Sequence, residues 1–175
     1  MKTLVGFVLV AALAIPAVPS AAAQVAKVGT FDRTSIVVAF YRSPTWDAKL
    51  NAALAERDKA RVAGDRKKVN ELSKWGQSQQ ELAHKQLAGS APIDNIMEMM
   101  KPVLATVAAQ EKVARIVPQG SRIDRTAATV DVTERLLDQL QADKKTRQIV
   151  EQLQDFKKAH PVMSRLYMFL FRFVG

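Results

Sequence analysis

The chain has 175 residues, with 26 lysines and arginines against 17 aspartates and glutamates, two histidines and no cysteine. Because 48% of it is apolar and it has only seven glycines and seven prolines, the composition excludes a disordered or low-complexity chain and fits one domain. The lack of cysteine excludes disulfides, thiolate nucleophiles and cysteine-ligated metal centres. The net charge of +9 is therefore a clue to a partner rather than to a reaction.

Residues 1–23 have the layout of a secretory signal peptide. Lys2 precedes an apolar run from Leu4 to Val18, and the segment ends in the small residues Ala21-Ala22-Ala23. The alternative is a retained membrane anchor, but this run is shorter than the roughly 20 residues of a spanning helix. We expect cleavage after Ala23 and a mature protein that works outside the cytoplasm.

The mature chain begins with strand-like residues. Residues 27–32 predict a short strand, and the cluster at 36–41 fits either a second strand or the start of a buried helix. Ser43-Pro44 then marks a helix start, because serine can cap a helix and proline is tolerated at the first helical position.

Residues 45–88 are rich in good helix formers, contain no proline and carry only a thin apolar stripe. We expect one long helix here, weakened by two internal glycines, that projects as an arm or pairs with another helix. A turn at 89–92 and a second, apolar helix from Ile93 would complete a helical hairpin, with Pro102 kinking or splitting the returning helix.

The elements after the arm are shorter. The sequence predicts strands at 114–118 and 126–130, followed by a helix over 132–141. Asp131 would be the N-cap of that helix, with a glutamate three residues later completing a capping box. In residues 144–159 the apolar residues recur every three to four positions among charged ones, which predicts an amphipathic helix.

Three short motifs at the ends of this layout are similar to those of a known family. They are Lys27-Val28-Gly29-Thr30-Phe31-Asp32, Ala114-Arg115-Ile116-Val117, and Val130-Asp131-Val132-Thr133-Glu134 leading into Leu136-Leu137. With the signal peptide and the charged helical arm, they make the chain resemble the Skp/OmpH family of periplasmic chaperones.

The resemblance implies a mainly α, α+β protein: a small β-containing head with a long helical hairpin arm. The head and arm would occupy residues 24–142, with the arm at about 44–117. Residues 143–175 lie beyond the usual end of the family and are expected, from their own pattern, to form an amphipathic, aromatic C-terminal extension. In function it implies an ATP-independent periplasmic holdase that binds unfolded outer-membrane or envelope proteins and forms a homo-trimer. Such a protein is not an enzyme and uses no cofactor.

The arm carries a basic cluster, which is the candidate partner-binding site. Its members are Arg57, Lys59, Arg61, Arg66, Lys67 and Lys68. One interpretation is a solvated helix face with local ion pairs, such as Asp58 with Arg61. The other is a cationic surface for acidic partners, namely unfolded envelope proteins or anionic lipid headgroups. We expect no nucleic-acid partner, since no binding motif is present.

The C-terminal end is aromatic and basic. Candidate contact residues for a membrane or a neighbouring subunit are Arg165, Tyr167, Phe169, Phe171, Arg172 and Phe173. They fit packing against the head or a subunit, or else an interfacial anchor with arginines on anionic lipid. The anchor favours an alternative function, that of an envelope-surface structural or interaction protein held at a membrane by this tail.

Candidates for catalysis or metal binding are weak. His84 lies among glutamines and lysines on the arm, and His160 lies at a helix end before a proline. Asp32 and Asp131 could be neighbours in the head, but no nucleophile motif, phosphate loop or metal-ligand spacing accompanies them. We therefore expect no catalytic, cofactor or metal residues.

Overall fold

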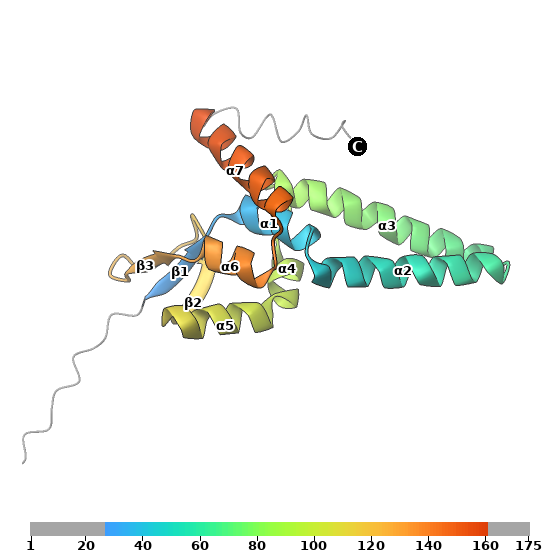
Figure 1. Cartoon of the computed structure of the whole chain (residues 1–175), viewed down its shortest axis with the longest axis horizontal. Helices are drawn as coiled ribbons and strands as arrows, with labels where there is room; N and C mark the ends of the chain where they lie inside the picture. The colour runs from blue at the N-terminus through green and yellow to red at the C-terminus, as the bar shows by residue number, and fades with distance from the viewer. Residues whose placement is uncertain (1–26, 161–175) are drawn as a thin grey trace, which may run out of the picture.

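The computed structural model describes residues 27–160 and shows a small α/β head from which two helices extend as an arm (Figure 1). The elements, in chain order, are β1 (Val28–Phe31), α1 (Arg33–Tyr41), α2 (Pro44–Val62), α3 (Arg66–Leu87), α4 (Asp94–Met99), α5 (Lys101–Glu111), β2 (Arg115–Pro118), β3 (Thr129–Asp131), α6 (Thr133–Gln139) and α7 (Lys144–Ala159). The expected fold class, mainly α with a small β-containing head and a helical hairpin arm, is confirmed.

The head is built on a three-stranded parallel sheet of order β2-β1-β3. Gly29 of β1 is in register with Ile116 of β2 and Val130 of β3. The side chains of Ile116 and Val130 pack against the hydrophobic core. A Cβ atom added at Gly29 would lie 2.9 Å from Cγ1 of Ile116. The glycine of the first motif is therefore required by close packing within the sheet.

The cluster at 36–41, for which the sequence allowed a strand or a helix, belongs to helix α1. Ile36, Val37, Ala39 and Phe40 are all fully buried. A helix that is apolar on every side must be surrounded by other elements to be buried. Helix α1 is enclosed by α6, α7 and the base of the arm. Helix α1 is thus the centre of the core.

Residues 144–159 form the predicted amphipathic helix α7, which packs across α1 (Figure 1). Val150 is only 3% exposed in this contact. The part of the C-terminal extension that the structure describes therefore belongs physically to the head. The aromatic tail, including Arg165 to Phe173, lies outside the described residues.

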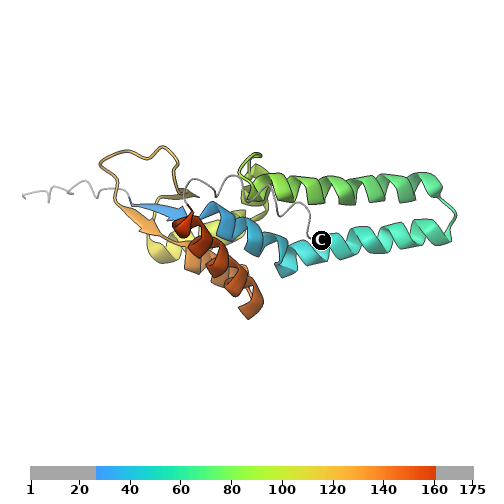
Figure 2. The ribbon, with the colours of Figure 1, turned by 90° about the horizontal axis from the view of Figure 1, so that it is seen from above.

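The arm differs from the expected arrangement. Helices α2 and α3 run antiparallel and side by side, and the turn between them lies at residues 63–65 rather than at 89–92 (Figure 2). Gly64 adopts a φ of 73°, and the Asp65 side chain accepts a hydrogen bond from the backbone N–H of Lys68. A left-handed glycine followed by an N-cap ends one helix and starts the next.

The helices after the arm belong to the head. Pro102 stands in the first turn of α5, so it splits the expected returning helix into α4 and α5. Strand β3 is shorter than predicted and ends at Asp131, which is not the N-cap of α6. Its carboxylate instead accepts hydrogen bonds from the backbone N–H and the hydroxyl of Thr133, at 2.8 and 2.6 Å, and so shapes the turn into α6.

Candidate functional site

The arm carries the candidate partner-binding residues, and the structure divides the basic cluster into two groups. Arg57 and Arg61 lie 3.5 and 3.3 Å from the carboxylate of Asp58, and Lys68 lies 2.9 Å from that of Glu56. The Glu56 contact raises the pKa of Lys68 above its ordinary value. Each of these three cations has an acidic neighbour, with Arg57 and Arg61 sharing the single carboxylate of Asp58, as the solvated-face interpretation predicts.

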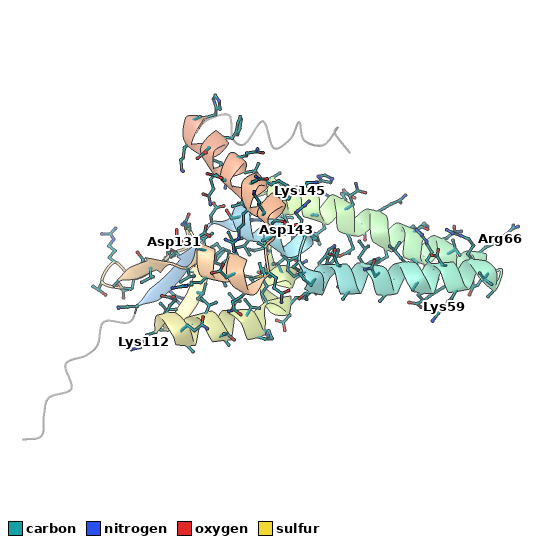
Figure 3. All side chains as sticks on the ribbon, viewed as in Figure 1. Lys59, Arg66, Lys112, Asp131, Asp143 and Lys145 are labelled. Atoms are coloured by element: carbon teal, nitrogen blue, oxygen red, sulfur yellow. The ribbon has the colours of Figure 1, made fainter. Side chains whose placement is uncertain are left out.

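The other three cations of the cluster, Lys59, Arg66 and Lys67, have no ion-pair partner among residues 27–160. All three are exposed, and Figure 3 shows Lys59 and Arg66 at the far end of the arm. Val62, beside the hairpin turn, is 91% exposed. The end of the arm, hereafter the arm tip, therefore combines uncompensated positive charge with an exposed apolar side chain.

The base of the arm is fixed to the head by aromatic rings. Trp46 of α2 contacts Phe40 and Tyr41 of α1, with ring centroids 5.9 and 4.8 Å apart. On its other side Trp46 stacks on Trp75 of α3, with centroids 6.4 Å apart. The rings link both arm helices to α1, which makes the arm a continuation of the core at this end.

A buried polar network joins the end of α3, where the arm meets the head, to α1 and to the start of α4. The Gln86 side chain is 1% exposed, accepts a hydrogen bond from the Tyr41 hydroxyl and donates to the Asn95 side chain and to the Pro92 carbonyl oxygen. Burial raises the pKa of Tyr41 above its ordinary value, so the network gives its phenol no tendency to ionise near neutral pH.

Arg33 binds the loop after α3 as well. Its guanidinium donates to the carbonyl oxygens of Ala91 and Gln86. Together with Gln86 it satisfies backbone groups where α3 ends and α4 begins. Sequence reasoning missed both residues, because a glutamine and an arginine near helix ends look like ordinary surface positions.

The four residues considered for catalysis do not come together. His84 is exposed on α3, whereas the His160 ring lies 4.8 Å from that of Phe156 at the end of α7. Asp32 and Asp131 are neighbours, as the sequence suggested: the hydroxyl of Thr133 accepts from the Asp32 backbone N–H and donates to the Asp131 carboxylate. Both carboxylates are engaged in shaping helix starts.

Within residues 27–160, no three His, Cys, Asp or Glu side chains are grouped so that they could hold a metal ion. In the same range no helix combines the length and the apolar character that crossing a membrane requires.

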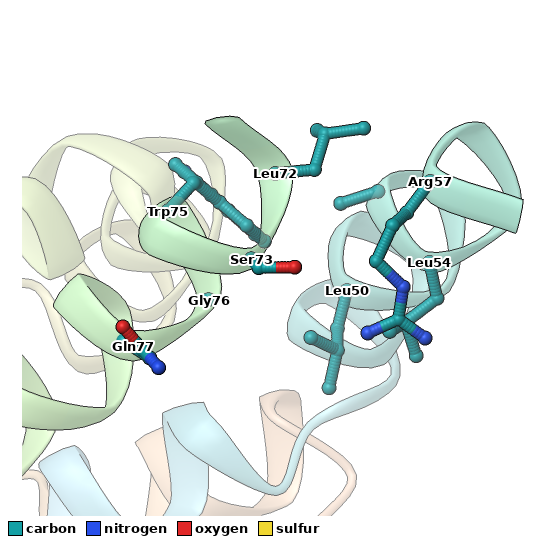
Figure 4. Close-up of a pocket in the computed structure, with 9 residues that line it drawn as sticks. Leu50, Leu54, Arg57, Leu72, Ser73, Trp75, Gly76 and Gln77 are labelled. Carbon is teal, nitrogen blue, oxygen red and sulfur yellow. The ribbon is translucent and has the colours of Figure 1, made fainter. Parts of the chain in front are cut away.

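An open pocket lies between the two arm helices. Figure 4 shows residues that line it, among them Leu50, Leu54 and Arg57 on α2 and Leu72, Trp75 and Gly76 on α3. Arg57, counted in the sequence with the exposed basic cluster, lies against this pocket with its side chain only 30% exposed. Its position could not be read from the charge pattern, in which it resembles its neighbours.

Comparison with known proteins gives no relative from which a function could be transferred. No protein-family model matches the chain, and no curated protein or solved structure matches it.

Proposed function

We propose that the protein is an exported, ATP-independent holdase that binds unfolded envelope or outer-membrane proteins in the periplasm. The observation that carries the proposal is the arm, a pair of largely solvated helices that extends from the head. Its tip carries an exposed valine and three cations that have no ion-pair partner in the described part of the chain. The signal-peptide layout and the motifs resembling Skp/OmpH proteins support it.

The mechanism follows from the arm's surface. Unpaired cations attract an acidic client from a distance and raise the rate of encounter, an effect that salt screens. Short-range contact then shields apolar client segments from one another without covalent chemistry. The aromatic base fixes the arm to the head and keeps the tip away from it.

The test is suppression of aggregation. A urea-unfolded acidic outer-membrane protein is diluted with stoichiometric amounts of the full-length chain, and turbidity and the rate of capture are measured. We expect suppression, and capture several-fold slower at low salt when Lys59, Arg66 and Lys67 are all changed to Gln. The difference should shrink at about 0.5 M salt, where the Debye length is only a few ångströms.

The matched control removes three exposed cations from the head: Lys144, Lys145 and Arg122, each changed to Gln. This variant has the same net charge as the tip variant and should capture the client at the wild-type rate. No suppression by the wild-type chain would eliminate the holdase proposal. Equal slowing by both variants would eliminate the specific role of the tip.

A chain ending at His160 tests the membrane-anchor alternative. Truncation after Gln141 is unsuitable, because it would remove α7 and with it Val150 from the core. The holdase proposal predicts that the chain ending at His160 still suppresses aggregation. If the anchor function is correct, this chain instead loses both vesicle sedimentation and activity.

A further inference from the structure

The pocket between α2 and α3 (Figure 4) has a volume of about 290 Å³, and its lining residues lie between the base of the arm and its tip. Its walls are mainly apolar and include Leu50 and Leu54 from one helix and Leu72 and Trp75 from the other. This volume is at the lower end of the roughly 300–1,000 Å³ range of small-molecule sites. It suits one short chain rather than a two-chain lipid.

At one lining position of the pocket α3 has a glycine, where two paired helices normally interdigitate side chains. Gly76 lines it, and a Cβ atom added there would meet nothing within 4 Å. Gly76 is not among the positive-φ glycines, so no backbone requirement explains this residue in a helix interior. The space it leaves is open to an occupant.

Arg57 gives the pocket its polarity. Its Nε is buried and has no hydrogen-bond partner among residues 27–160, and within the same range the guanidinium forms one ion pair, a long 3.5 Å contact with Asp58. Of the described residues that line the pocket, none is an aspartate or a glutamate. An unpaired, desolvated guanidinium N–H is costly, and the groups that satisfy it best are anionic oxygens placed for a charge-assisted hydrogen bond.

We propose that this pocket binds a single-chain carboxylate amphiphile, a medium-chain fatty acid. Its hydrocarbon chain lies against Leu50, Leu72 and Trp75, and its carboxylate accepts hydrogen bonds from the Arg57 guanidinium. The apolar walls, the small volume and the lone cation each match one part of such a ligand. The inference does not depend on the chaperone function and is tested separately from it.

The experiment is isothermal titration of the full-length chain with decanoate below its micelle concentration, with decanol as the uncharged homologue. Tryptophan fluorescence is a second readout, because Trp75 lines the pocket. We expect saturable binding of one decanoate per chain, about tenfold tighter than binding of decanol. Failure to see saturable decanoate binding overturns the proposal.

Three variants locate the site. Arg57→Gln should weaken decanoate binding about tenfold and leave decanol unchanged. Gly76→Leu should abolish binding of both ligands, and Gly76→Ala should weaken both partially. Lys74→Gln removes an exposed charge one residue before Trp75 and serves as the matched control, with unchanged affinities. Thermal melts by circular dichroism establish that each variant is folded.

Other outcomes overturn the assignment. Decanoate affinity unchanged in Gly76→Leu would place the ligand elsewhere on the chain. If Arg57→Gln and Lys74→Gln lost the same amount of decanoate affinity, the loss would be due to net charge and not to a contact with Arg57. An apolar client segment is the competing occupant. If Gly76→Leu weakens client binding while decanoate does not saturate the wild-type chain, the pocket is a client subsite and not a fatty-acid site.

Discussion

The ammonium nitrogen of Lys157, near the end of α7, lies 3.0 Å from a carboxylate oxygen of Asp32, the residue that follows β1. The other carboxylate oxygen of Asp32 accepts hydrogen bonds from the backbone N–H and the hydroxyl of Ser35, at 2.8 and 2.6 Å, and so caps α1. Gln154 of α7 donates to the same hydroxyl at 3.0 Å. One carboxylate thus joins the central helix to the C-terminal helix that covers it.

This arrangement predicts an acid-sensitive contribution to stability. Burial by itself would raise the pKa of Asp32, but the hydrogen bonds from Ser35 and Lys157 outweigh it and hold the pKa below its ordinary value. A carboxyl whose pKa is lowered by folding stabilises the native state at neutral pH. That contribution is fully present above the ordinary carboxyl pKa and is lost as the pH falls below it and through the lowered pKa of the folded state.

Two substitutions separate the charge from the cap. Asp32→Asn retains a capping oxygen and loses the charge, so we expect a loss of about 1 kcal/mol at pH 7 and a shallower decline in acid. Asp32→Ala loses the cap as well, for about 1 kcal/mol more. Urea denaturation between pH 2 and 7 measures both. An acid decline as steep in Asp32→Asn as in the wild type would contradict the assignment.

The buried amide of Gln86 gives a second prediction. Gln86→Leu has nearly the same volume but leaves the Tyr41 hydroxyl and the Asn95 side chain without their partner. Buried polar groups that lose a partner cost about 1–3 kcal/mol, and we expect a loss of about 2–3 kcal/mol in the free energy of unfolding. Gln80→Leu, at an exposed position of the same helix, should change it by less than about 0.5 kcal/mol.

The two glycines of the arm should respond in opposite directions to alanine. Gly76 is in a helix interior with open space around it, so Gly76→Ala should raise the free energy of unfolding by about 0.5–1 kcal/mol. Gly64 has a φ of 73°, where alanine is strained, and Gly64→Ala should lower it by about 1 kcal/mol. Denaturation of the two variants side by side is the measurement. If both substitutions changed the free energy of unfolding in the same direction, the hairpin turn would not be at Gly64.

The same glycines show how far the sequence could be read. The strands, the start of α2 at Ser43 and the amphipathic α7 all follow from local patterns, and these predictions are confirmed. The signal for the arm turn was also present, as Gly64 followed by Asp65, but it lies inside a long run of helix formers that hides it. A glycine followed by a capping aspartate can end one helix and start the next even within a segment whose composition favours a continuous helix.

The contacts between elements could not have been predicted in this way. The helical spacing in α7 predicts an apolar face, yet nothing in it specifies that α1 is the partner or that Lys157 reaches Asp32. Likewise, six cations close in sequence look equivalent, whereas the structure pairs Lys68 with Glu56 across the hairpin and places Arg57 against a pocket. Such differences depend on tertiary geometry, which periodicity does not contain.

The close approach at Gly29 gives the last prediction. An added methyl group would lie 2.9 Å from Cγ1 of Ile116 and 3.3 Å from Cγ2 of Val113, so β1 or its neighbours must move. Overpacking of this kind costs about 1–3 kcal/mol, and we expect Gly29→Ala to lower the free energy of unfolding by that amount. Ile116→Ala removes the nearer obstacle and serves as the second arm of a double-mutant cycle.

The sign of the coupling between these two substitutions is the decisive quantity. If the clash with Ile116 is the cause, Gly29→Ala costs markedly less in the Ile116→Ala background, with a favourable coupling of about 1 kcal/mol measured by urea denaturation. Strictly additive losses would mean that the glycine is needed for another reason, such as its backbone conformation. Because Gly29 is in register with both Ile116 and Val130, the same cycle also tests its place in the central strand of the parallel sheet.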